Sequence, residues 1–322
     1  MTVRLLRAAD LEKVCPMSHA IDAVARGFAA LSTGQATVPV RLSVPLRHDG
    51  VALTMPAALR DASCYSVKVV SVAPRNTLAG RPVVMATVLL GDAATGEILA
   101  LIDGTALTAL RTGAAGGVAA RALSRAGATR VALFGAGAQA RTQLLALAAV
   151  RPIAEVRLVA RDPAHAAALR AWAAHERALA SVAIQPARPH DAVTGADIVV
   201  TATSSPTPVF QGAWLGDGVH VTAVGSFTPR MRELDEETLR GARLVVDQRA
   251  AALAEAGELV GRRAEELVEL GEIVAGRAPG RSNDRERTVF KSVGSAIQDL
   301  AVASIAYERA REAGIGEEIV FP

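Results

Sequence analysis

Apolar residues recur at two different spacings along the chain, and the change of spacing divides it into regions. Residues 11–31 carry apolar positions at helical spacing, which predicts an amphipathic helix interrupted at Pro16, with Ser18 as the N-cap of its second part. Between residues 38 and 100, short β-rich runs follow one another, separated by turn sequences such as His-Asp-Gly and Ala-Thr-Gly. Strands this close together predict a mostly antiparallel sheet. An alanine-rich helix is expected over residues 105–126.

From Thr129 onward, predicted strands and helices alternate. The apolar runs that predict strands lie at residues 130–134, 155–160, 182–184, 197–203, 220–226 and 242–247. Such alternation predicts βαβ units, and therefore a parallel sheet with helices on both faces. Residues 288–312 predict one long helix with no strand after it.

These patterns predict an α/β protein with two domains, for which a length of 322 residues is sufficient. We expect a Rossmann-type doubly wound parallel sheet over residues 113–297. A β-rich N-terminal domain is expected over residues 1–112, completed by residues 298–322 at the end of the chain.

The composition argues against several classes of protein. Hydrophobic residues make up 51% of the chain, the formal net charge is +3 and aromatic residues are only 3%. Nucleic-acid-binding proteins more often concentrate basic and aromatic residues on one stripe. The six histidines and two cysteines lack metal-ligand spacing, and no apolar run approaches the ~18 residues of a membrane span. The N-terminus lacks a signal-peptide core. We therefore expect a cytoplasmic protein that binds no metal, nucleic acid or membrane.

A glycine motif follows the first strand of the alternating region. Gly135, Gly137 and Ala140 form the pattern G-x-G-x-x-A at the start of a predicted helix. The first glycine permits a tight turn, the second lets a pyrophosphate approach the backbone, and the small third residue allows close packing of helix and strand. Ala138 and Gln139 belong to the helix N-terminus, which offers N–H groups to phosphates. The motif predicts a dinucleotide-binding site.

The end of the second predicted strand favours NADP over NAD. An NAD-dependent enzyme usually has a carboxylate there for the ribose 2′-hydroxyl, and Ala160 takes that place here. Arg161 comes next, where a guanidinium group would meet a 2′-phosphate. If the strand ends one or two residues later, Asp162 takes the place of the carboxylate that binds the ribose 2′-hydroxyl, so NAD stays the alternative cofactor. Thr203 and Ser204, which follow a later strand, are expected to line the phosphate and ribose side of the cofactor.

Several motifs, in one order along the chain, resemble the ornithine cyclodeaminase/μ-crystallin family, which also contains ketimine reductases and an alanine dehydrogenase branch. The matching segments are Thr54–Pro56, Val67–Val70, Pro74–Asn76, Gly80–Pro82, the run IDGTALTALRTGAA, Gly135–Ala140, Val224–Ser226, Arg232–Asp235 and FKSVGSAIQDLA from Phe290. Each motif is loose when taken alone. Their shared order over nearly the whole chain identifies the family.

The resemblance implies a homodimer built through the N-terminal domain, with substrate held between that domain and the Rossmann domain. It also implies that Arg41, Lys68 and Arg111 correspond to the residues that bind the substrate carboxylate. Charge-assisted hydrogen bonds suit that task, and each contributes about 1.5–3 kcal/mol. Thr87 and Ser292 are expected to add polar contacts, the first to the substrate and the second to the cofactor.

One position departs from two branches of the family. The cyclodeaminases and alanine dehydrogenases have an aspartate two residues after the glycine that matches Gly225, and this chain has Phe227 there. Phenylalanine can neither bind a substrate amine nor activate water, but it can form an apolar wall against ring methylenes. The sequence Gly-Ser-Phe-Thr-Pro resembles that of the family's bacterial ketimine reductases. Gly225 and Ser226 are expected to contact the cofactor.

The residues therefore favour NADPH-driven reduction of a small cyclic 2-imino acid, either Δ1-pyrroline-2-carboxylate or Δ1-piperideine-2-carboxylate. Lys68 is the candidate proton donor if it lies near the imine nitrogen. Two alternatives stay open. One is an ornithine cyclodeaminase or amino-acid dehydrogenase of the same family, and the other is a protein that binds NADPH and a small ligand without turnover, as μ-crystallin does.

Overall fold

The computed structural model describes residues 2–320 and divides the chain into two compact units. The first unit contains the chain up to Arg111 together with the chain from Ser295, and the second is Thr112–Gly294. The domain boundaries expected from the sequence, after residues 112 and 297, lie within one and three residues of these limits. Helix α3 (Gly104–Leu123) carries the chain from the first unit into the second.

An eight-stranded sheet forms the centre of the first unit. Its order is β16-β1-β7-β6-β5-β4-β2, with β3 also paired to β4. Every pairing is antiparallel except that between β1 and β7, which confirms the expected mostly antiparallel sheet. The strands are β1 (Thr2–Leu6), β2 (Ala36–Thr37), β3 (Leu42–Pro45), β4 (Val51–Leu59), β5 (Cys64–Val72), β6 (Val84–Asp92), β7 (Ile98–Asp103) and β16 (Glu317–Val320).

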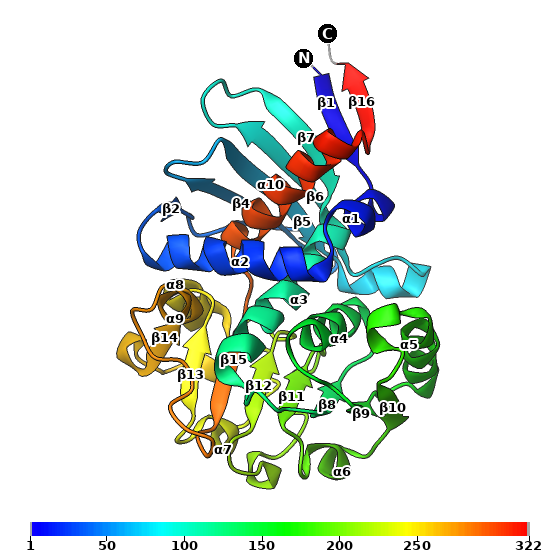
Figure 1. Cartoon of the computed structure of the whole chain (residues 1–322), viewed down its shortest axis with the longest axis vertical. Helices are drawn as coiled ribbons and strands as arrows, with labels where there is room; N and C mark the ends of the chain where they lie inside the picture. The colour runs from blue at the N-terminus through cyan, green and yellow to red at the C-terminus, as the bar shows by residue number, and fades with distance from the viewer. Residues whose placement is uncertain (1, 321–322) are drawn as a thin grey trace. The chain divides into compact units, whose positions relative to one another are not determined.

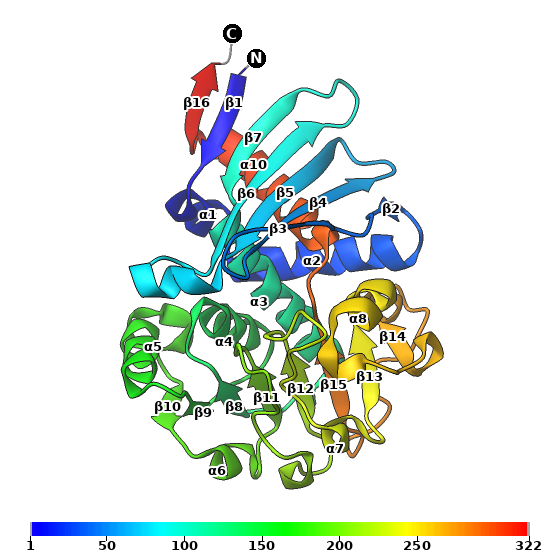
Figure 2. The same ribbon diagram turned by 180° about the vertical axis from the view of Figure 1, so that it is seen from behind.

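Helices α2 (Met17–Ser32) and α10 (Ala296–Ala313) lie on one face of this sheet, as Figure 1 shows. Figure 2 shows the strands from their other side, which the helices of this unit leave open. The two helices pack closely, because a Cβ on Gly27 would come within 3.3 Å of the Ala301 side chain. The break expected at Pro16 is present between α1 (Ala8–Val14) and α2. Pro16 itself is the N-cap of α2, so the assignment of Ser18 as the cap was wrong.

The prediction for the C-terminal section was also wrong. In place of one helix, residues 288–320 contain strand β15 (Thr288–Lys291), helix α10 and strand β16. The short run Thr-Val-Phe-Lys is fully buried in the second sheet, and Gly294, with a φ of +84°, separates it from the helix. Strand β16 pairs with β1 through the backbone, and the ion pair Arg4–Glu318 (2.5 Å) joins the two strands. Polar strands of this kind lack an apolar run, so hydropathy does not reveal them.

The second unit is a doubly wound α/β domain, as the sequence predicted. Its eight strands are all parallel, in the order β10-β9-β8-β11-β12-β15-β13-β14. The first five, numbered in chain order within this unit, follow the 3-2-1-4-5 part of the order of dinucleotide-binding sheets, and β15, the last strand of the unit, takes the sixth place. The strands are β8 (Arg130–Phe134), β9 (Glu155–Val159), β10 (Ala183–Pro186), β11 (Ile198–Thr201), β12 (His220–Ala223), β13 (Arg243–Val246), β14 (Leu267–Glu269) and β15.

Alternation along each strand gives this sheet an apolar core on both faces. In β8, Val131 and Leu133 join one buried cluster, and Ala132 and Phe134 join the other. The helices are α4 (Ala138–Val150), α5 (Pro163–His175), α6 (Pro189–Val193), α7 (Glu236–Leu239), α8 (Arg249–Glu255) and α9 (Leu270–Val274), and short 3-10 turns complete the connections. None of the helices within residues 2–320 is long and apolar enough to cross a membrane.

Candidate active site

Lys68 is buried on the helix-covered face of the first sheet. Side chains alternate along β5, and Ser66, Lys68 and Val70 share the buried face, whereas Val69 points the other way. Lys68 is only 1% exposed, and its Nζ lies 2.7 Å from Oδ2 of Asp299 on α10. The lysine therefore does not face solvent, and its charge has a buried carboxylate as partner.

Asp299 also binds Arg111, which joins the same cluster. The Arg111 guanidinium donates from Nε to Oδ1 of Asp299 (3.1 Å) and from Nη1 to Oε1 of Gln298 (2.5 Å). Sequence reasoning did not single out Asp299 or Gln298, although both lie within the quoted FKSVGSAIQDLA segment. The signal in the sequence was the position of Asp299 within a run of apolar helical residues. A carboxylate in such a run is buried, and a buried carboxylate requires a partner.

The cluster holds more positive than negative charge. Burial lowers the pKa of Lys68 to about 8, with further lowering by the charges of Arg111 and Arg41, while Asp299 opposes the shift. Arg41 thus lies within electrostatic range of Lys68, and the three predicted carboxylate ligands form one cationic group. The Nε2 atom of Gln298 is buried and has no hydrogen-bond partner within residues 2–320. A partly compensated cationic group with an unsatisfied donor is suited to binding a small anion.

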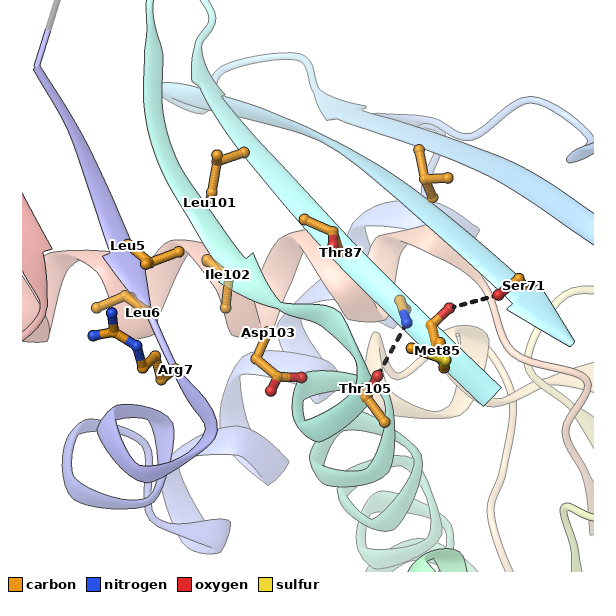
Figure 3. Close-up of a pocket in the computed structure, with 12 residues that line it drawn as sticks. Leu5, Leu6, Arg7, Ser71, Met85, Thr87, Leu101, Ile102, Asp103 and Thr105 are labelled. Carbon is orange, nitrogen blue, oxygen red and sulfur yellow. Dashed lines mark hydrogen bonds between the residues drawn. The ribbon is translucent and has the colours of Figure 1, made fainter. Parts of the chain in front are cut away.

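Thr87 does not belong to this group, which corrects the expectation from the sequence. Thr87 pairs with Val69 across β5 and β6, so its side chain lies on the opposite face of the sheet from Lys68. It faces a hollow of about 710 Å³ on that side, together with Met85 and Thr105, as Figure 3 shows. A contact between Thr87 and a substrate held by Lys68 is therefore not supported.

The glycine turn after β8 fits a dinucleotide. Gly135 has a φ of +105°, and a Cβ there would lie 2.3 Å from the Ala202 carbonyl oxygen, so only glycine is accommodated. Gly137 is the N-cap of the 13-residue helix α4, without a side-chain cap, and a Cβ built on it meets no atom within 4 Å. Ala140 is fully buried between helix and strand. Open space beside uncapped N–H groups is what a pyrophosphate requires.

Two neighbouring segments complete this edge of the sheet. Ala138 is exposed at the start of α4, and Oε1 of the half-buried Gln139 is enclosed without a hydrogen-bond partner among the described residues. Strand β9 ends at Val159, and Arg161 is exposed two residues later. The Asp162 carboxylate accepts the Ala164 N–H (2.8 Å) as the N-cap of α5.

Three hydroxyl groups expected to contact the cofactor are instead bonded to buried acids. The Thr203 hydroxyl donates to Glu233 (2.7 Å) and the Ser226 hydroxyl to Glu258 (2.5 Å). The Ser292 hydroxyl donates to Asp247 (2.8 Å), which also accepts the N–H groups of residues 293 and 294. These hydrogen bonds hold the loops after β11, β12 and β15 in place, and a contact of the three residues with a cofactor stays a prediction.

The remaining predicted positions lie on the same loops. Ser204 is exposed after β11 and its side chain is accessible to a ligand. The Gly225 N–H donates to Glu233 (2.7 Å), and Phe227, two residues further on, is half-buried. The loops that follow β8, β9, β11 and β12 thus bring the glycine turn, Arg161, Ser204 and Phe227 to the carboxyl edge of one parallel sheet, where ligands bind in such folds.

Known proteins resemble the chain over nearly its full length. The family model described as "Ornithine cyclodeaminase/mu-crystallin family" matches residues 2–314. A Δ1-pyrroline-2-carboxylate reductase of Bacillus cereus is 38% identical over 326 residues, which cover 98% of this chain and 99% of that relative.

Two solved structures share the fold closely. The Δ1-pyrroline-2-carboxylate reductase of Thermococcus litoralis, in complex with NADH and L-proline, superposes with a TM-score of 0.93 at 40% identity, covering 98% of this chain and all of the other. An archaeal alanine dehydrogenase dimer with bound NAD gives a TM-score of 0.93 at 33% identity, with both chains fully covered.

Proposed function

Because the chain belongs to the ornithine cyclodeaminase/μ-crystallin family, we propose that it is an NAD(P)H-dependent oxidoreductase that reduces a small cyclic 2-imino acid to the cyclic amino acid. The observation that carries this proposal is the buried group of Lys68, Arg111 and Asp299, whose net positive charge suits a substrate carboxylate. The relatives named Δ1-pyrroline-2-carboxylate reductase, one of them with NADH and L-proline bound, support it.

In this proposal the cationic group fixes the substrate by its carboxylate. Arg111 donates two of its five N–H groups to Asp299 and Gln298, and these hydrogen bonds orient the guanidinium before a ligand binds. Lys68 is oriented by the same carboxylate, and Arg41 adds a third positive charge. A preorganised group of this kind binds an anion without first reorganising, which is how active sites use fixed charges.

Lys68 is also suited to move a proton. With a pKa of about 8, Lys68 is mostly in the ammonium form at neutral pH. This pKa is close enough to neutral pH for the side chain to transfer its proton. The cyclic imine must carry a proton on nitrogen to accept hydride at C2, and Lys68 is the buried donor on the carboxylate-binding face. A bound nicotinamide cofactor supplies the hydride, and the chain provides orientation and charge.

Phe227 distinguishes this reaction from others in the family. Ornithine cyclisation with ammonia release and alanine oxidation both require a polar group near the substrate amine, and the branches that perform them have an aspartate at this position. Phe227 offers an apolar ring instead. A preformed cyclic imine has methylene groups that suit such a surface, and it needs no activated water.

We propose that the cofactor is NADPH in preference to NADH. Nicotinamide dinucleotides are bound by the solved relatives, with NADH and NAD as their ligands. In this chain Ala160 replaces the carboxylate at the end of β9, Arg161 is exposed beside it, and the Asp162 carboxylate is engaged in capping α5. A guanidinium without a competing acid favours a 2′-phosphate over a ribose 2′-hydroxyl.

The experiment that tests these proposals follows the loss of NADPH absorbance with Δ1-pyrroline-2-carboxylate and with Δ1-piperideine-2-carboxylate, and NADH is run in parallel. We expect rapid oxidation of NADPH with at least one imine and a lower kcat/KM with NADH. Ammonia release from ornithine or alanine-dependent reduction of NADP would favour the other branches of the family. Tight NADPH binding without turnover of either imine would favour a binding role.

The open face of the first sheet supports a further proposal, that the protein is a homodimer joined through this unit. Exposed apolar side chains gather there on β3, β5 and β6, namely Leu42, Val44, Val69 and Met85, with exposures of 71%, 59%, 53% and 48%. The hollow in Figure 3 lies on the same face. Apolar patches of this kind usually mark interfaces, and a similar solved structure is a dimer. Sedimentation should give twice the mass of one chain, and a monomer would contradict the proposal.

A further inference from the structure

Two acids and a lysine are buried beneath the loops that follow β11 and β12. Glu233, Glu258 and Lys291 have exposures of 0%, 4% and 1%, and all three lie in the second unit. The Nζ of Lys291 is 3.7 Å from Oε2 of Glu258. Burial of three ionisable side chains is costly unless each has partners, so a defined network is expected around them.

Glu233 joins the ends of two neighbouring strands. Its Oε1 accepts both the N–H and the hydroxyl of Thr203, after β11, and its Oε2 accepts the N–H of Gly225, after β12, each at 2.7 Å. A Cβ on Gly225 would lie 2.5 Å from Oε1 of Glu233, so a glycine is required for the carboxylate to reach the backbone. One side chain therefore fixes the positions of two loops.

Glu258 and Lys291 hold the next residue of the second loop. The Ser226 hydroxyl donates to Oε1 of Glu258, and Lys291 donates to both the carbonyl and the hydroxyl oxygen of Ser226, each at 2.6 Å. Oε1 of Glu258 also accepts the N–H of Glu233 (2.7 Å). The network is thus continuous from Thr203 to Ser226, and the residue that follows it is Phe227.

This network has a defined place in the sheet. Strands β11 and β12 are the fourth and fifth of the dinucleotide-binding order, on the half that receives the second nucleotide, which is the nicotinamide nucleotide in an NAD(P) enzyme. Its charges do not balance, because Lys291 neutralises one carboxylate and Glu233 is bonded only to neutral donors. The formal charge of the three side chains together is therefore one negative unit.

We propose that Glu233, Glu258 and Lys291 are positioning residues for the nicotinamide end of the cofactor, and that their excess negative charge favours its oxidised, cationic form over its neutral, reduced form. The inference rests on the proposed function only in requiring a nicotinamide cofactor. Hydride donation to the substrate C2 converts a neutral ring into a cation. A fixed negative charge nearby stabilises the charge that develops during that transfer.

The test is the dissociation constant of each cofactor form in the absence of substrate, measured by NADPH fluorescence and by competition with NADP⁺. Glu233→Gln is compared with wild type, and Glu265→Gln, at an exposed position of the same unit, is the matched control. Because Glu233→Gln removes one fixed negative charge, the ratio of the oxidised-form to the reduced-form dissociation constant should rise by roughly tenfold. The control should leave the ratio unchanged.

Glu258→Gln provides a second variant with the same change of charge, and it decides the test if Glu233→Gln does not fold. An equal loss of affinity for both forms, or an unchanged ratio in a folded variant, would overturn the proposal and leave a structural role alone. Failure of wild type to reduce any imine would reject the proposed function without affecting this result, because the binding measurement contains no substrate.

Discussion

Replacement of Lys68 by methionine is expected to lower kcat/KM for the cyclic imine by about 100- to 1,000-fold, since it removes a charge-assisted hydrogen bond and a candidate proton donor together. Methionine retains the length and the apolar stem of lysine. Lys68 is 1% exposed and bonded to Asp299, so the substitution removes the ammonium group from a buried site. Steady-state kinetics with NADPH in excess measure the effect.

The pH dependence separates this role from a purely structural one. Only the ammonium form of Lys68 attracts a carboxylate or donates a proton, and its pKa is lowered to about 8 by burial, then by Arg111 and Arg41. Wild-type kcat/KM should therefore fall as the pH rises above about 8, and the variant should lack this step. The same substrate is used for both proteins, so its own titration cancels in the comparison.

Lys13→Met is the matched control, because Lys13 is exposed on α1 and the substitution is identical. The control should keep wild-type kcat/KM and the wild-type pH profile. A Lys68→Met protein that folds normally and retains more than about a third of wild-type kcat/KM would contradict the assignment of Lys68 to the substrate site.

Replacement of Asp299 by asparagine should have the largest effect on stability. Asp299 is the buried carboxylate that contacts both Lys68 (2.7 Å) and Arg111 (3.1 Å), and its side chain is fully enclosed. Removing one partner from a buried ion pair typically costs 3–5 kcal/mol, so the free energy of unfolding should fall by about 3 kcal/mol. Denaturant unfolding at pH 7 measures this change.

The same substitution should alter activity in a predictable direction. Asp299 raises the pKa of Lys68 against the effect of burial, so its loss moves that pKa further below about 8. The decline of kcat/KM should then begin at a lower pH than in wild type. Glu308→Gln, at an exposed position of the same helix α10, is the control. A stability loss for Asp299→Asn no larger than that of Glu308→Gln would contradict the buried charge cluster.

Features set by short stretches of sequence were predictable. The run from Arg130 to Ala140 specifies a strand, a turn and a helix through local preferences, and the structure contains each of them. The strand Thr288–Lys291 was missed because four residues next to a helical pattern carry too weak a signal. Strand β16 was missed because its pairing with β1 depends on the opposite end of the chain.

Features set by contacts between distant residues were not predictable from the pattern alone. Lys68 and Arg111 were identified through the family resemblance, but Asp299 is 188 residues from Arg111, and no local pattern joins them. Thr87 was placed with the substrate because the register of β6 against β5 was unknown, and a shift of one residue reverses the face of every side chain. The hydrogen bonds of Thr203, Ser226 and Ser292 to buried acids were not foreseen, because those acids lie 30, 32 and 45 residues away in the sequence.

Transfer of deuterium from NADPH labelled at the reactive C4 position shows directly whether the cofactor delivers hydride to the imine carbon. The enzyme is incubated with the labelled cofactor and Δ1-pyrroline-2-carboxylate, and the amino acid formed is analysed by mass spectrometry and NMR. We expect proline with one deuterium at C2, formed in step with cofactor oxidation. Cofactor oxidation without deuterium at C2 would contradict the proposed reaction. So would the absence of both products, proline from the five-membered imine and pipecolate from the six-membered imine.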